Sequence, residues 1–210
     1  MFRDYNELED FVRLNQHNEQ RNCEFKGNIS WNDPEQKHKI VKAILSMTNL
    51  RDGGYFIIGV AKTSNVDGYQ LIGVTRDVAN TYNHDNVSAL ANSFSRSNIN
   101  IQLKLFDKDD KFFVVIQVSE FSNVPAICGK DYGEILHAGR IYGRPSRQPE
   151  SSDNLSVEDV DEILELAVEK RFRRRQTFFE RVGYVQQPPI SQTPPQPNAK
   201  ELFRQESENF

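Results

Sequence analysis

A glutamate and a lysine two positions apart could carry chemistry in the stretch Glu19–Lys26. Alternate side chains of a strand share a face, so a strand here would place Glu24 beside Lys26 and turn Phe25 toward the core. A carboxylate can hold Mg²⁺, and a neighbouring lysine can stabilise the charge that develops on a phosphate during hydrolysis. Glu19 would supply a second carboxylate, which suits magnesium. The alternative is a Glu–Lys ion pair on a solvated strand face.

A second group of residues could contact nucleic acid. On a strand, Arg140, Tyr142 and Arg144 would share one face, and Arg147 follows shortly after. Two guanidinium groups around an aromatic ring suit phosphate contacts combined with base stacking. No acidic residue occurs between positions 138 and 149, which makes this the best local basic patch in the body of the chain. The alternative is an edge strand whose long side chains cover apolar surface and keep their charges in water.

Five of the six residues at 170–175 are basic, and two interpretations of this cluster stay open. The cluster could contact nucleic acid, or it could be the solvated end of a helix whose dipole favours cations there and acids at its start. The acids that open the same predicted helix are Glu158, Asp159, Asp161, Glu162 and Glu165.

Other kinds of catalytic or binding site are not indicated. The four histidines and two cysteines lack the spacing that is typical of zinc ligands. There is no Gly-x-Ser-x-Gly nucleophile motif. The glycine pair at 53–54 is not followed by the Gly-Lys-Ser/Thr of a P-loop, so a tight turn is its expected role.

The elements that must position these residues follow from capping and periodicity. Helices are predicted near 4–12, 33–48, 87–94 and 156–179, the last with its apolar residues on one face. Strands are predicted at 22–26, 55–60 and 69–73, as a hairpin of 101–105 with 112–118, and at 134–144. The apolar run at 55–60 lies between glycines, which favours a strand that is buried on both faces. This order of elements predicts an α+β fold, with a mixed β-sheet flanked by helices.

The length and the proline content predict one domain and a tail. A chain of 210 residues is enough for about one domain of ~150 residues with an extension. Five of the nine prolines lie between positions 188 and 197. We therefore predict a single domain at 1–184 and a flexible, proline-rich tail at 185–210. The apolar residues Leu202, Phe203 and Phe210 make the end of the tail a candidate for docking on a protein partner or another subunit.

Charge and composition restrict the environment and the partners. The net charge is −4, from 26 basic and 30 acidic residues, so any nucleic-acid contact requires a local basic surface. The longest apolar run spans six residues at 56–61, far too short for a membrane helix. The start of the chain has no apolar signal-peptide core. Two cysteines cannot form a disulfide framework, so we predict a cytoplasmic protein with no membrane partner.

Several segments, taken in order, resemble the Schlafen-type, AlbA-related domain, and the small stand-alone prokaryotic members most of all. The resemblance covers about 19–149. The segments are Glu19–Lys26, Trp31, 44–60, 72–74, 113–118, 124–125 and 141–144.

The resemblance implies a nucleic-acid-binding fold. Some family members are metal-dependent endoribonucleases that cut tRNA and rRNA, and others are catalogued only as DNA- or ATP-binding. In the nucleases, two glutamates five positions apart precede Phe-Lys, and a third acid follows the central strand. Glu19, Glu24 and Lys26 match the first part and become the implied catalytic residues, with Mg²⁺ or Mn²⁺ on the two glutamates.

The third acidic position of the family pattern falls near 61–62, where this chain has alanine and lysine. Asp67 is the nearest later acid, and it lies in a predicted turn. The resemblance therefore implies a nucleic-acid-binding protein, with RNA favoured over DNA, and leaves open whether it cleaves structured RNA such as tRNA. The alternative is a non-enzymatic DNA-, RNA- or ATP-binding interaction module, for example a subunit of a phage-defence assembly.

Overall fold

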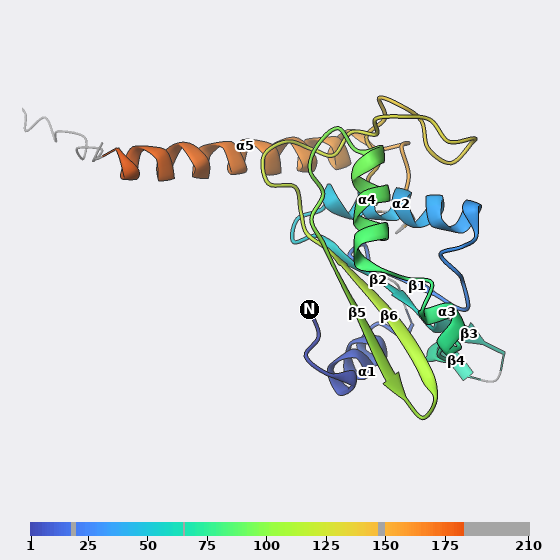
Figure 1. Cartoon of the computed structure of the whole chain (residues 1–210). Helices are drawn as coiled ribbons and strands as arrows, with labels where there is room; N and C mark the ends of the chain where they lie inside the picture. The colour runs from blue at the N-terminus through green and yellow to red at the C-terminus, as the bar shows by residue number, and fades with distance from the viewer. Residues whose placement is uncertain (18–19, 65, 147–149, 183–210) are drawn as a thin grey trace, which may run out of the picture. The chain divides into compact units, whose positions relative to one another are not determined.

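The computed structural model of this protein describes residues 1–17, 20–64, 66–146 and 150–182 (Figure 1). The chain divides into two compact units, Met1–Phe172 and Arg173–Phe210. Within the second unit the described residues are 173–182, which continue and end the last helix. The predicted proline-rich tail at 185–210 lies outside the described residues, and the predicted domain boundary at 184 stays a prediction.

The first unit is built on a mixed β-sheet, which confirms the predicted α+β fold. β1 is parallel to β2, whereas β6 pairs antiparallel with both of its neighbours, β2 and β5. The spatial order is β1-β2-β6-β5, formed by Cys23–Lys26, Gly54–Ile58, Lys111–Val118 and Ile101–Lys108. A separate two-stranded sheet pairs β3 (Val60–Thr63) with β4 (Val66–Leu71). β1 is thus an edge strand of the main sheet, with one side left without a strand partner among the described residues.

The helices begin where the capping residues predict. Asp4 accepts a hydrogen bond from the Glu7 amide at the start of α1. Asp33 accepts from two amides at the start of α2, whose first residue is Pro34. The helices are α1 (Tyr5–Leu14), α2 (Pro34–Thr48), α3 (Arg76–Ala79), α4 (His84–Phe94) and α5 (Val157–Arg181).

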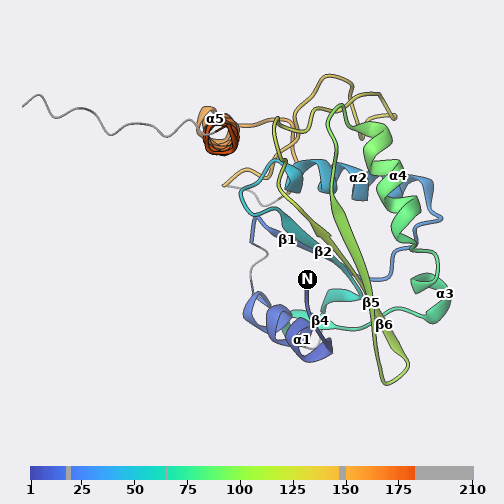
Figure 2. The same ribbon diagram turned by 60° about the vertical axis from the view of Figure 1, so that its left-hand side comes forward.

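Helices cover both faces of the main sheet, with α1 on one face and α2 and α4 on the other (Figures 1 and 2). Phe56 of β2 and Ile116 of β6 pack with α2 and α4 on one face. Ile57 and Val115, their neighbours in sequence, pack with Leu8 of α1 on the other. Because alternate side chains point to opposite faces, a strand with helices on both sides must be apolar throughout. This explains the uninterrupted apolar runs of β2 and β6.

The strand predicted at 134–144 is wrong. This part of the chain forms isolated bridges, such as Ile127 with Ile141, instead of a ladder. Gly133 and Gly139 adopt left-handed backbone angles, with φ of 48° and 81°, which interrupt an extended chain. The alternation of side chains inferred from a strand therefore does not hold here.

The last helix differs from its prediction in which residues it buries. Its inward side is formed by Ile163 and Leu166, which pack with Phe121. The predicted apolar face contains Val160, Leu164 and Val168, and all three are exposed. The helix therefore has two apolar sides, and only one of them is covered by described residues.

None of the helices in the described ranges is both long and apolar enough to cross a membrane. Both cysteines, Cys23 and Cys128, are buried, and neither is part of a disulfide among the described residues.

Candidate nucleic-acid site

β1 places Glu24 and Lys26 side by side. Burial alternates along the strand, with Cys23 and Phe25 in the core and the two charged residues partly exposed. Lys26 Nζ lies 2.9 Å from Glu24 Oε1, and the Lys26 side chain keeps 41% of its surface exposed. The predicted shared face of Glu24 and Lys26 is therefore present. Because the ammonium group of Lys26 is already exposed to solvent, it can contact a phosphate without a rearrangement of the protein.

The other oxygen of Glu24 is held by a buried arginine. Arg144 Nη1 donates to Glu24 Oε2 at 2.6 Å, and Nη2 donates to the carbonyl of Cys23 at 2.9 Å. The Arg144 side chain is only 1% exposed, and its Nε has no hydrogen-bond partner among the described residues. Arg144 thus covers the open edge of β1 and links the 140–144 segment to the sheet, instead of facing solvent as expected.

The structure does not bring Arg140, Tyr142 and Arg144 onto one solvent face. Tyr142 is 1% exposed, and its hydroxyl accepts a hydrogen bond from the His137 amide at 2.8 Å. Burial raises the pKa of Tyr142. Arg140 is the exposed member, and its nearest acid is Asp153 at 3.8 Å. The expected stacking surface was inferred from strand alternation, and this segment is not a strand.

Two predicted site residues, Glu19 and Arg147, lie outside the described residues. Their assignments stay predictions. In the described part of the chain, no group of three or more His, Cys, Asp or Glu side chains could hold a metal ion. Glu24 supplies one carboxylate, and both of its oxygens already contact cations. A divalent cation here would therefore need Glu19 and would compete with Lys26 or Arg144 for the oxygens of Glu24.

Positions 61 and 62, near which the resemblance implies a third acid, lie beside the end of β1. The Gly59 amide donates to the carbonyl of Lys26 at 2.8 Å, and β3 begins at the next residue. A Cβ atom added to Gly27 would lie 3.3 Å from that of Ala61. Asp67 is almost fully exposed, with His17 at 3.6 Å. An acid at position 61 or 62 would thus adjoin β1, and this chain has alanine and lysine there.

Asn49, at the end of α2, binds the backbone of the segments around Ala126 and Tyr142. It was not singled out from the sequence. Its Nδ2 donates to the carbonyls of Ala126 and Tyr142 at 3.0 and 2.8 Å. Its Oδ1 accepts from the Ala126 amide at 2.7 Å. The side chain therefore holds two loop segments on the helix end. The available signal was an asparagine between a helix and a glycine turn, which is common as a cap and does not indicate distant partners.

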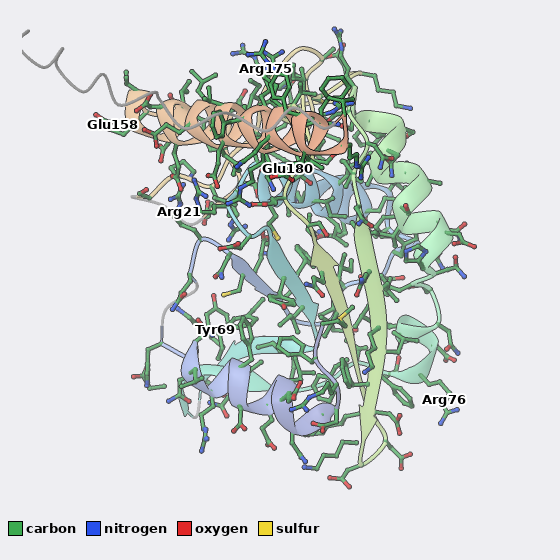
Figure 3. All side chains as sticks on the ribbon, turned by 90° about the vertical axis from the view of Figure 1, so that its left-hand side faces the viewer. Arg21, Tyr69, Arg76, Glu158, Arg175 and Glu180 are labelled. Atoms are coloured by element: carbon green, nitrogen blue, oxygen red, sulfur yellow. The ribbon has the colours of Figure 1, made fainter. Side chains whose placement is uncertain are left out.

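Arg21 was also missed, and it joins three parts of the first unit (Figure 3). Its Nε donates to the carbonyl of Arg144 at 2.6 Å, and its Nη1 lies 2.9 Å from Glu162 of α5. A hollow of about 330 Å³ beside it is also lined by Asn22 and Arg51. Arg51 in turn donates to Glu169 at 2.8 Å. The two arginines therefore anchor α5 next to β1, and neither is an unpaired cation.

Asp159 fixes the start of α5 near the same place. Burial alone would raise the pKa of Asp159, but hydrogen bonds from Ser146 and Ser156 outweigh burial and lower it. In the basic cluster at 170–175, Lys170 pairs with Glu120. At least this member of the cluster therefore supports the fold.

Comparison with known proteins gives a family and two distant structural similarities. The sequence profile described as Schlafen, AlbA_2 matches residues 19–153, more than half of the chain. The N-terminal domain of a RecG-related protein from Nitrosomonas europaea has 19% identity and a TM-score of 0.42, over 57% of this chain and 74% of that one. The DIP2311 protein from Corynebacterium diphtheriae has 15% identity and a TM-score of 0.39, over 63% of this chain and 22% of that one. No curated protein sequence matches this chain.

Proposed function

This chain belongs to the Schlafen, AlbA_2 family, and on that premise we propose that it binds nucleic acid at the end of β1, with RNA preferred over DNA. The family match over 19–153 carries the proposal. The preference for RNA rests on the tRNA- and rRNA-cutting members that the resemblance implies.

The charges around Glu24 support this proposal. One carboxylate contacts two cations, Lys26 and Arg144, so the group carries a net positive charge. Arg144 is buried, and the exposed charge is therefore the Lys26 ammonium. A net charge of −4 over the whole chain restricts phosphate binding to such local positions.

Charge reversal of Lys26 tests binding. We expect Lys26→Glu to weaken binding of a labelled tRNA by about tenfold and to reduce the salt dependence of the association constant, because one phosphate contact is lost. The measurement is fluorescence anisotropy at several salt concentrations, with single-stranded DNA of equal length for comparison.

Lys108→Glu is the matched control for this variant. The Lys108 side chain is 45% exposed and has one acidic neighbour, Glu9. It lies on β5, the opposite edge strand of the main sheet, so its substitution should leave the affinity unchanged. Equal affinities of the two variants would exclude Lys26 from the binding surface.

We further propose that the same site cleaves RNA in the presence of Mg²⁺ or Mn²⁺ held by Glu19 and Glu24. The observation that favours cleavage is the close pair of Glu24 and Lys26 on one strand face. A bound divalent cation would polarise the phosphate and lower the pKa of a water molecule. Lys26 would then stabilise negative charge on the phosphate.

Glu24→Gln tests cleavage while keeping a hydrogen-bond acceptor near Arg144. With tRNA and Mn²⁺, we expect the cleavage rate to fall by about 100-fold or more while binding persists. Glu120→Gln is the matched control, because the Glu120 carboxylate also contacts a lysine and an amide. Melting temperatures of both variants show that they are folded under the assay conditions. Unchanged cleavage by Glu24→Gln would remove Glu24 from the reaction.

The alternative function is that of a module that binds nucleic acid without cleaving it. The presence of alanine and lysine instead of an acid at 61–62 favours this alternative. If wild-type protein shifts tRNA in a salt-sensitive manner but leaves it intact with every divalent cation, binding is the function of this site. A melting temperature that rises with added ATP would instead indicate the ATP-binding variant of this alternative.

A further inference from the structure

The hollow beside the start of β1 has two arginines in its lining. Its volume is about 330 Å³. The residues that line it are Gln20, Arg21, Asn22, Leu50, Arg51 and Glu162. Arg21 is connected to the proposed binding site through Arg144, because Arg21 Nε donates to the carbonyl of Arg144 and the Arg144 guanidinium donates to Glu24. The hollow therefore adjoins the group of charges that contains Lys26.

Both arginines keep hydrogen-bond donors that the described residues do not use. A guanidinium group has several N–H bonds in one plane. Arg51 donates through Nη1 to Glu169 at 2.8 Å. Arg21 Nη1 lies 2.9 Å from Glu162, whereas the nearest acid to its Nη2 is Asp159 at 3.8 Å. Donors in this arrangement suit the oxygens of a phosphate, which arginine binds in a bidentate manner.

The acids that pair with these arginines are accessible to solvent. The side chains of Glu162 and Glu169 are 41% and 33% exposed. Ion pairs of this exposure contribute little to stability, because water screens them. Both acids lie in the part of α5 that belongs to the first unit, and the buried residues Ile163 and Leu166 hold that part of the helix as well. The two carboxylates can therefore turn away from the arginines while the helix stays in place.

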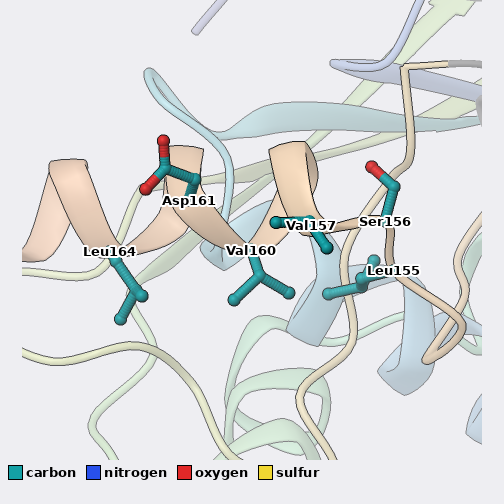
Figure 4. A pocket seen from close by; sticks show the side chains of 6 residues that line it. All are labelled: Leu155, Ser156, Val157, Val160, Asp161 and Leu164. Carbon is teal, nitrogen blue, oxygen red and sulfur yellow. The ribbon is translucent and has the colours of Figure 1, made fainter.

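A second hollow, at the start of α5, does not offer the same chemistry (Figure 4). Its volume is about 270 Å³, and its lining residues are Leu155, Ser156, Val157, Val160, Asp161 and Leu164. The charged member of this set is an acid, and no cation is among them. A phosphate would be repelled there, so of these two hollows the one beside Arg21 is the one that suits an anion.

We propose that the hollow lined by Arg21 and Arg51 binds a phosphate of the nucleic acid that contacts Lys26, and that Glu162 and Glu169 occupy the two arginines in its absence. This inference rests on the proposed function. The phosphate replaces one carboxylate on each arginine, so the two acids compete with the ligand. Breaking the exposed ion pairs costs little, whereas each phosphate that is neutralised releases counterions from the nucleic acid. As a result, α5 lowers the affinity of the site for nucleic acid.

Two substitutions with opposite expected effects distinguish this role from a purely structural one. In the full chain, we expect Glu162→Gln to tighten binding of a labelled tRNA by about threefold or more, because the competing charge is removed. Arg51→Gln should weaken binding by about tenfold and reduce its salt dependence by about one phosphate contact. The measurement is fluorescence anisotropy at several salt concentrations. Residues that only support the fold would give no increase in affinity in either variant.

Glu165→Gln and Arg76→Gln are the matched controls. Glu165 is an exposed acid three positions further along α5 than Glu162, and it does not line the hollow. Arg76 is exposed on α3, at the opposite side of the molecule from Arg21 (Figure 3). We expect both control variants to bind tRNA within about twofold of the wild type. Melting temperatures of all four variants show that they are folded under the assay conditions.

The results separate this inference from the proposed function. If Lys26→Glu weakens binding but Glu162→Gln strengthens it no more than Glu165→Gln does, the inference is overturned and binding at Lys26 is retained. Equal affinities of Arg51→Gln and Arg76→Gln overturn the inference as well. If the wild type and every variant leave both tRNA and single-stranded DNA unbound, the inference and the proposed function are both wrong.

Discussion

Glu24 has two cationic neighbours at similar distances but with very different exposure. Lys26 Nζ is 2.9 Å from its carboxylate and Arg144 Nη1 is 2.6 Å away, yet their side chains are 41% and 1% exposed. Water screens the Lys26 pair, so that pair contributes little to stability. Arg144 is removed from water, so its contacts with Glu24 and with the carbonyl of Cys23 must offset the free-energy cost of burying its charge. The same carboxylate therefore takes part in one contact of the proposed binding site and one contact that supports the fold.

This difference predicts unequal effects on stability. Glu24→Ala should reduce the free energy of unfolding by about 3–5 kcal/mol, because it leaves a buried guanidinium without its counter-charge. Lys26→Ala should change it by less than about 1 kcal/mol. Urea unfolding followed by circular dichroism measures both values. Similar small losses for the two variants would mean that Arg144 is not a buried charge in solution.

At the scale of elements, the start of α5 is fixed by the buried carboxylate of Asp159. Asp159 accepts hydrogen bonds from the Ser146 amide and from both the amide and hydroxyl of Ser156. These contacts lower its pKa in spite of burial. They also attach the end of the 140–146 segment to the helix that follows. The ionised form of Asp159 therefore joins two parts of the first unit.

Acidification should weaken this junction. Because the pKa of Asp159 is lower in the folded than in the unfolded chain, its contribution is complete above about pH 4 and is lost as the pH falls through the lowered value. Asp159→Asn should therefore lower the melting temperature by several degrees near neutral pH and by less in acid. Melting temperatures of both proteins across this range test the prediction. A difference in melting temperature that stays constant with pH would contradict it. The melting temperature of Ser156→Ala should lie between those of the wild type and Asp159→Asn.

The predictable elements were those with local signals. The capping residues Asp4 and Asp33 fixed two helix starts, and the apolar runs of β2 and β6 indicated strands covered on both faces. At the site, alternation alone placed Glu24 beside Lys26. The burial of Arg144 and the three contacts of Asn49 join residues more than 75 positions apart, and no local pattern contains them.

At the scale of the whole molecule, the net charge of −4 is an average over unlike surfaces. Near β1, two cations contact one carboxylate. This local arrangement favours a phosphate in a chain that is acidic as a whole. A sum over the chain does not predict it, because short-range electrostatics depend on which charges lie within a few ångströms of one another.

The buried contact between Glu24 and Arg144 also has an evolutionary consequence. Since loss of Glu24 alone would leave the guanidinium of Arg144 buried without its counter-charge, selection for a folded chain acts on the two positions together. Relatives that replace one residue should replace the other as well, by compensatory substitution. A descendant that had lost all activity would still be under pressure to retain this glutamate. Conservation at position 24 is therefore a poor guide to catalysis, and Lys26, which has no contact with Arg144 among the described residues, is the better position to compare.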